Sequence, residues 1–174
     1  MRWMKRFLES RGWDVHAISL KPNNASVPFD VMARQLDTFV TATFPAGEKF
    51  DLVAFSMGGL VSRYYIQKLG GYARVRRFVT LSTPNHGTLL AWLSGYPGVK
   101  QMRPGSEMLR DLNGDVSKLV PLDYTSIYTP FDLSILPARS SCMPVARNVV
   151  IWVPFHPLMV RMPGPMLAVE RALE

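Results

Sequence analysis

The sequence predicts a single α/β domain in which a mostly parallel sheet is flanked by helices. Three observations support this. Stretches with the composition of strands alternate with stretches of helical periodicity along most of the chain. One strand candidate, Phe50–Phe55, is apolar almost throughout, as is usual for strands that are covered on both faces. The chain has 174 residues, 48% of them hydrophobic, which favours one globular domain with a substantial core.

The first third of the chain predicts a helix, a strand and a second helix. Residues 2–11 have apolar side chains four positions apart on one side and charged ones on the other, the pattern of an amphipathic helix. Residues 14–20 are expected to form a short strand that ends before Pro22. The second helix is expected to begin at Pro28 and to end near residue 43.

The rest of the chain predicts four more strands and three more helices. The expected strands are residues 50–55, 75–82, 124–128 and 148–153, and the expected helices are residues 57–69, 106–112 and 163–173. Together with residues 14–20, this makes a sheet of about five strands. Residues 88–121 join two of these strands with more chain than a short connection needs, so they are expected to be an insertion.

Composition excludes several classes of function. The only cysteine, Cys142, excludes an internal disulfide framework, and no metal-binding or phosphate-binding motif is visible, so we expect no cofactor and no metal. The net charge is +7, but the arginines are scattered, and we expect no nucleic acid partner. No apolar run reaches the length of a membrane span and no signal peptide is visible, so a cytoplasmic location is expected if Met1 is the true start.

The strongest functional signal is a serine between a strand and a helix, in the segment Leu-Val-Ala-Phe-Ser-Met-Gly-Gly at 52–59. A nucleophile elbow places a serine on such a turn and needs small residues two positions before and after it, here Ala54 and Gly58. The backbone N–H of Met57, at the start of the helix, is suited to stabilise an oxyanion. The alternative is an ordinary junction in which Ser56 only caps the helix.

At this point the sequence resembles the α/β-hydrolase fold, and within it bacterial lipases and esterases. The segment AFSMGG is similar to their elbow, with alanine in place of the usual first glycine, and TPNHGT at 83–88 is similar to a loop of lipase-like members. The similarity continues through YTPFD at 128–132 and VPFH at 153–156. The resemblance implies an α/β-hydrolase-like sheet and a catalytic triad of serine, acid and histidine in that chain order.

The triad that the resemblance implies is Ser56, Asp132 and His156. Asp132 follows the strand at 124–128, and His156 follows the last strand, which are the places of the family's acid and histidine. Asp123 precedes its strand and would emerge at the wrong end of the sheet. Other candidates are better explained as structural or surface residues, namely His86 in the TPNHG loop, His16 in an early strand, and Asp111 and Asp115 in the insertion.

The resemblance also implies that strands are missing at the N-terminus. The family's sheet has eight strands, and the five expected here match the last five. The third strand, whose following loop supplies the second oxyanion donor, would lie between residues 14–20 and residues 50–55. Either these two strands pair directly, or the chain is a shortened form of a longer protein with Met1 as an internal methionine. We favour the second interpretation.

The predicted function is that of a serine ester hydrolase, similar to lipases or carboxylesterases, acting on a small-molecule or lipid ester. The apolar insertion at 88–121 is expected to be either a lid or pocket wall, or an ordinary helix over the sheet. Arg74, Arg76 and Arg77 would permit a weak contact with anionic lipid, although a solvated turn is the favoured interpretation. The alternative function is a catalytically impaired hydrolase-like domain that binds a lipid or a protein partner.

Overall fold

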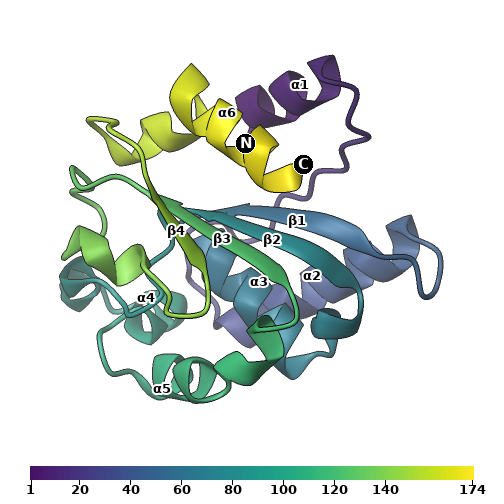
Figure 1. Ribbon diagram of the computed structural model, residues 1–174. Coiled ribbons are helices and arrows are strands. Elements are labelled where there is room, and N and C mark those ends of the chain that lie inside the picture. Colours follow the sequence, from purple (N-terminus) through teal and green to yellow (C-terminus); the bar gives the residue numbers. More distant parts are fainter.

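A computed structural model describes all 174 residues as a parallel sheet between two helical layers (Figure 1). The strands are β1 (Phe50–Phe55), β2 (Val75–Leu81), β3 (Asp123–Tyr128) and β4 (Arg147–Val150). The helices are α1 (Arg2–Ser10), α2 (Phe29–Thr43), α3 (Met57–Lys68), α4 (Pro97–Gln101), α5 (Glu107–Gly114) and α6 (Pro163–Leu173). The predicted α/β class and the similarity to an α/β-hydrolase sheet are confirmed.

The four strands are all parallel and are ordered β1-β2-β3-β4, so each strand pairs with the next one along the chain. Parallel neighbours need a crossover between them, and α3 supplies the crossover between β1 and β2. Their carboxyl ends therefore meet at one edge of the sheet. The loops that leave this edge contain Ser56, Asp132 and His156.

The two faces of the sheet carry separate apolar cores. Helices α2, α3 and α5 pack with Phe50, Phe78 and Tyr124 in a cluster of 21 buried residues. On the opposite face, α1 and α6 pack with Val79 and Ile127 in a cluster of 12. Figure 1 shows α1 and α6 together on one side and α2 and α3 on the other. A strand in this sheet is covered on both faces, which explains the apolar composition of β1.

The predicted strand at 14–20 is wrong. These residues are extended but belong to no strand, and no backbone hydrogen bond joins any of them to β1. The sheet therefore has four strands rather than about five, and β1 lies at its edge. A strand is defined by its pairing, and the side chains of this segment, however strand-like, do not supply a partner.

The connection between β2 and β3 contains short helices rather than one long one. It includes α4, α5 and two 3₁₀ turns, and α5 extends two residues beyond the stretch expected to be helical. Ser106 caps α5, since its Oγ accepts a hydrogen bond from Leu109 N–H at 3.3 Å. None of the helices is long and apolar enough to cross a membrane.

Candidate active site

Ser56 lies on a sharp turn between β1 and α3. Its backbone has φ 54° and ψ −130°, a conformation that non-glycine residues rarely adopt. The neighbouring strand holds this turn in place, since Ser56 N–H donates to Leu81 O at 2.8 Å. Thr83 Oγ1 donates to Ser56 O at 3.0 Å. This strained backbone, held by its hydrogen bonds with Leu81 and Thr83, matches the turn of a nucleophile elbow.

The steric requirement at the elbow differs from the expectation. The motif suggested that Gly58 must be small, but a Cβ atom at Gly58 would meet nothing within 4 Å. At Gly59, in contrast, a Cβ atom would lie 2.0 Å from Thr83 Oγ1. Gly59 allows α3 to approach the loop after β2, and it is therefore the glycine that the packing requires.

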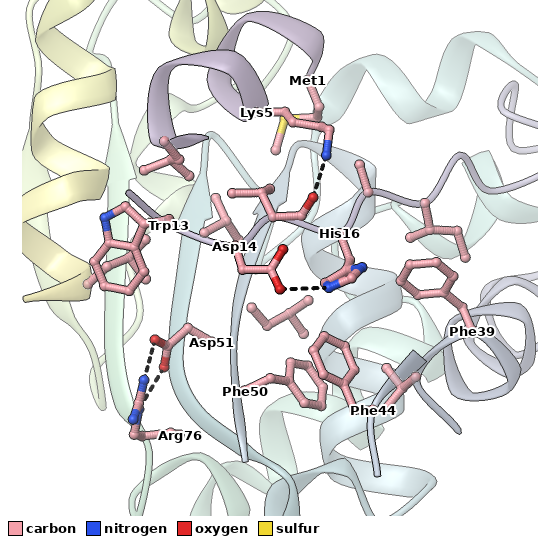
Figure 2. A pocket seen from close by; sticks show the side chains of 18 of the residues that line it. Met1, Lys5, Trp13, Asp14, His16, Phe39, Phe44, Phe50, Asp51 and Arg76 are labelled. Atoms are coloured by element: carbon pink, nitrogen blue, oxygen red, sulfur yellow. Dashed lines mark hydrogen bonds and ion pairs between the residues drawn. The ribbon is translucent and has the colours of Figure 1, made fainter. Parts of the chain in front are cut away.

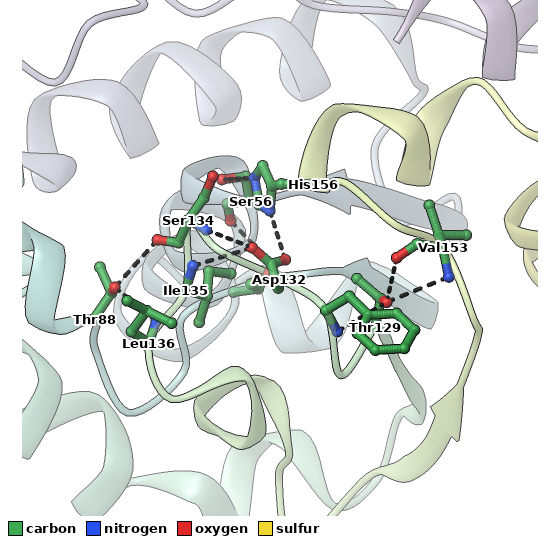
Figure 3. A network of polar contacts seen from close by, with 11 residues as sticks. Ser56, Thr88, Thr129, Asp132, Ser134, Ile135, Leu136, Val153 and His156 are labelled. Atoms are coloured by element: carbon green, nitrogen blue, oxygen red, sulfur yellow. Dashed lines mark hydrogen bonds and ion pairs between the residues drawn. The ribbon is translucent and has the colours of Figure 1, made fainter.

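His156 lies beside Ser56, with its Nε2 2.9 Å from Ser56 Oγ. It begins a 3₁₀ turn, His156–Val160, that follows β4. The chain leading to it is fixed to the end of β3, because Thr129 Oγ1 donates to Val153 O at 2.6 Å (Figure 3). The ring of Phe55 lies 4.7 Å from the imidazole ring. The histidine is thus held by both strand-end loops and by an aromatic contact.

Asp132 completes a hydrogen-bonded chain, with its Oδ2 2.7 Å from His156 Nδ1. The residue is only 2% exposed. Its other oxygen, Oδ1, accepts hydrogen bonds from the backbone N–H groups of Ser134 at 2.9 Å and Ile135 at 3.0 Å (Figure 3). Burial raises the pKa of Asp132, but the hydrogen bond and charge interaction with His156, with smaller contributions from Ser82 and from the backbone N–H of Ser134, outweigh burial and hold that pKa below its usual value.

The loop that carries Asp132 is tied to the loop after β2. Thr88 Oγ1 donates to Ser134 O at 3.1 Å and accepts from Leu136 N–H at 3.0 Å (Figure 3). Leu89 N–H donates to Leu136 O at 2.9 Å. The TPNHGT segment therefore supports the acid loop, a role that the sequence did not reveal.

The start of α3 offers donors for an oxyanion. The first N–H groups of a helix have no acceptor within the helix. Gly59 N–H already donates to Ser56 O at 3.0 Å, whereas Met57 N–H follows the serine directly and is not bound in that way. Met57 N–H is therefore available beside the serine, at the positive end of the helix dipole.

The competing candidates lie elsewhere. His86 Nδ1 is 3.4 Å from Asn113 Nδ2, and Asp123 is exposed at the amino end of β3. Asp111 and Asp115 form ion pairs with Lys68. His16 Nε2 is 3.4 Å from Asp14 Oδ2 in the unpaired segment. No three histidine, cysteine or acidic side chains are grouped so that they could hold a metal ion.

Comparison with known proteins places the chain in a family. A family model for palmitoyl protein thioesterase matches residues 1–129. No curated protein matches the chain. Because the family model covers well over half of the chain, the similarity extends beyond the elbow itself.

Solved structures show the same fold. The mature lipase BlEst2 of Bacillus licheniformis has a TM-score of 0.67 and 18% identity over 98% of this chain and 82% of its own. An extracellular α/β-hydrolase from a Paenibacillus species has a TM-score of 0.64 and 17% identity over 99% of this chain and 91% of its own. A polyneuridine aldehyde esterase variant has a TM-score of 0.65 and 19% identity over 98% and 92%. With the family match over residues 1–129, the protein belongs to the palmitoyl protein thioesterase family of α/β-hydrolases.

Proposed function

We propose that this hydrolase cleaves acyl esters through a covalent acyl-enzyme, with Ser56, His156 and Asp132 as its catalytic residues. The observation that carries the proposal is the continuous hydrogen-bonded chain from Ser56 Oγ through the imidazole of His156 to Asp132, at 2.9 Å and 2.7 Å. Hydroxyl, base and orienting carboxylate stand in the order that activates a serine for attack.

The proposed reaction has two stages. Ser56 Oγ attacks the acyl carbonyl carbon while His156 Nε2 accepts the hydroxyl proton, and Met57 N–H binds the oxyanion. The carbon–oxygen bond to the leaving alcohol then breaks, and the alcohol takes the proton from His156. In the second stage His156 takes a proton from water, and the resulting hydroxide attacks the Ser56 ester. The acid leaves and Ser56 regains its proton.

Apolar side chains around the site favour an acyl substrate. They are exposed on the loops that follow β2, β3 and β4, at the same sheet edge as Ser56. The set consists of Leu89, Trp92, Leu93, Phe131, Leu133, Trp152 and Phe155. Part of it belongs to the 88–121 insertion, which we propose forms a wall of the acyl site. Exposed apolar groups on loops that leave the same sheet edge as Ser56 suit a lipid-like ester better than a charged or sugar-like one.

Any contact with anionic lipid would not use the arginines after α3. Arg76 and Arg77 form ion pairs with Asp51, and with Arg74 they lie at the amino ends of the strands, away from Ser56. A weak contact near the site would instead involve Arg2 and Arg161. These two line a cleft of about 380 Å³ with Phe55, whose ring contacts His156.

Substrate class is tested by hydrolysis of p-nitrophenyl butyrate and of a matched butyryl thioester. The thioester is included because the family is named for palmitoyl thioesters. We expect both to be cleaved, and Ser56→Ala to lower kcat/KM by about 10³-fold or more while the fold is retained. A fluorophosphonate probe should label Ser56 in the parent chain only. Unchanged hydrolysis in Ser56→Ala would exclude the mechanism.

The alternative function is binding of a lipid or a protein partner by a catalytically impaired domain. It is favoured by the position of β1 at the sheet edge, because no strand on that side brings a loop with a second oxyanion donor toward Ser56. This alternative predicts a folded chain that neither hydrolyses the two esters nor reacts with the fluorophosphonate probe.

A further inference from the structure

The backbone of Ser56 is held from one side of β1 only. Because β1 lies at the edge of the sheet and backbone groups of a parallel strand point alternately to either side, those of Asp51 and Val53 point away from β2. They face a cavity of about 400 Å³, which is also lined by the extended segment after α1 (Figure 2). The hydrogen bonds that fix Ser56 come from the other side. Its N–H donates to Leu81 O at 2.8 Å, and Thr83 Oγ1 donates to its O at 3.0 Å.

Residues 83–88, which follow β2 and are called the linking segment below, join the serine to the acid loop. The first residue of the segment is the threonine that donates to Ser56 O. Its last residue donates from Oγ1 to Ser134 O at 3.1 Å (Figure 3). Ser134 N–H in turn donates to Asp132 Oδ1 at 2.9 Å. A shift of the linking segment would therefore move Ser56 and Asp132 relative to each other.

Asn85 lies in the middle of the linking segment and is fully buried. Its N–H donates to Thr83 O at 2.8 Å, within the segment. Its side-chain Nδ2 donates to Ser141 O at 2.8 Å, in the turn before β4. Its O and Oδ1 both accept hydrogen bonds from Arg63 Nη1, at 3.4 Å and 3.3 Å. Groups from two other parts of the chain therefore fix the middle of the linking segment.

Arg63 reaches Asn85 from α3, the helix that begins after the serine. The residue is fully buried, and neutral groups alone accept its hydrogen bonds. Nε donates to Gln67 Oε1 at 3.1 Å, and Nη2 donates to Leu112 O at 2.9 Å and to Asn113 Oδ1 at 3.0 Å, near the end of α5. With the two bonds to Asn85, all five N–H donors of the guanidinium have an acceptor. Burial lowers the pKa of Arg63 to about 10, so the side chain is still charged at neutral pH.

A buried cation is costly unless it is hydrogen-bonded, so its presence here needs an explanation. A guanidinium offers five donors in a fixed plane and can bind oxygens of several segments at once, which the compact ammonium group of lysine cannot do. An apolar side chain would avoid the cost of burying the charge, but it would leave the oxygens of Asn85 and Leu112 without these donors. Arg63 is thus suited to fix three segments relative to one another rather than to balance a negative charge.

We propose that Arg63 and Asn85 are positioning residues, which act through the linking segment to set the distance between Ser56 and Asp132 and so align His156 with both. This inference rests on the proposed function of those three residues. Neither Arg63 nor Asn85 has exposed surface with which to touch a substrate. A misplacement of about 1 Å at a reacting group can cost about 10²-fold in rate. Loss of either residue should therefore lower kcat and leave KM nearly unchanged.

The test compares Asn85→Ala with the matched control Asn148→Ala. Asn148 also binds backbone groups through its side chain, at Met143 and Ala146, but it lies near the amino end of β4. Hydrolysis of p-nitrophenyl butyrate is measured at a temperature at which circular dichroism shows each variant to be folded. We expect kcat of Asn85→Ala to fall by about 10²-fold with KM within about 2-fold of the parent. Asn148→Ala should keep both constants.

Proton NMR supplies a second readout that needs no turnover. His156 Nδ1 and Asp132 Oδ2 are 2.7 Å apart, and a proton held in so short a hydrogen bond resonates far downfield. This resonance should be present in the parent chain and in Asn148→Ala, and it should be lost by exchange with water in Asn85→Ala. Arg63→Lys keeps the charge but not the planar set of donors, and it should reproduce the losses of resonance and of kcat.

An unchanged kcat and an unchanged resonance in Asn85→Ala would overturn the proposal. Equal losses in Asn85→Ala and Asn148→Ala would also overturn it, because they would assign the network a general role in stability. If Asn85→Ala does not fold, Thr88→Val decides, since it removes only the bonds from the linking segment to the acid loop, and full activity with an intact resonance there would overturn the proposal.

The two readouts also separate this proposal from the proposed function. If the parent chain shows the resonance but neither hydrolyses the ester nor reacts with the fluorophosphonate probe, the proposed function fails. The resonance in the variants then decides the role of Arg63 and Asn85 alone. A parent chain with neither the resonance nor activity would overturn both proposals.

Discussion

The carboxyl edge of the sheet and the outer edge of β1 differ in how completely their polar groups are paired. Around Ser56, a serine, a histidine, a buried carboxylate and two supporting amides satisfy one another within 3.0 Å. Along β1, backbone groups of Asp51 and Val53 face a cavity instead of a strand. The residues of the site are held in place by hydrogen bonds to the ends of β2 and β3 and to the loop after β4. The site therefore forms without a strand on the other side of β1.

The largest effect, on kcat/KM, is expected when the carboxylate of Asp132 is replaced. Asp132→Asn keeps the shape of the side chain but removes the charge that orients His156. We expect kcat/KM to fall by about 10³-fold to 10⁴-fold in the ester assay. The control is Asp123→Asn, at the amino end of the same strand, which should leave kcat/KM unchanged. Equal losses in the two variants would contradict the assignment of Asp132.

The next largest effect is expected from the packing of the elbow helix. Gly59→Ala forces a methyl group into the side chain of Thr83, and overpacking of this kind costs about 1–3 kcal/mol. Gly58→Ala meets open space and should change the free energy of unfolding by no more than about 0.5 kcal/mol. Urea unfolding of both variants measures the difference. If Gly58→Ala is the more destabilised, the steric account of the elbow is wrong.

A smaller effect is expected from the pH dependence of stability. The pKa of Asp132 is lower in the folded protein than in an unfolded chain, so its contribution to stability is complete above the unfolded value of about 3.9. That contribution is lost as the pH falls through the lower, folded value. Melting temperatures between pH 6 and pH 3 should therefore fall more steeply in the parent chain than in Asp132→Asn. If the melting temperatures of the two proteins fall in parallel with pH, the pKa of Asp132 is not lowered by folding.

The contrast between the two edges also explains which features the sequence could predict. The elbow is encoded locally, by a buried strand, a serine and two glycines, and the chain order places Asp132 and His156 after successive strands. The amides of Ser134 and Ile135 were not predictable, because any residue supplies an N–H and only the turn aims it. The role of Gly59 depends on Thr83, which belongs to the next strand-end loop. Residues 14–20 have side chains typical of a strand, but their own sequence does not determine whether another strand lies beside them to pair with.

The smallest effect is expected from a substitution in the extended segment at residues 14–20. Ala17 lies in the extended segment and lines the cavity, and no backbone group of the segment is bonded to another. Ala17→Pro therefore removes an N–H that no ladder uses, and we expect a change of at most about 0.5 kcal/mol in the free energy of unfolding. The control, Thr125→Pro in the centre of β3, breaks pairing with a neighbour and should cost about 3 kcal/mol or more. A loss of more than about 2 kcal/mol in the free energy of unfolding of Ala17→Pro would contradict this account, because it would show that residues 14–20 are already paired with a neighbouring strand.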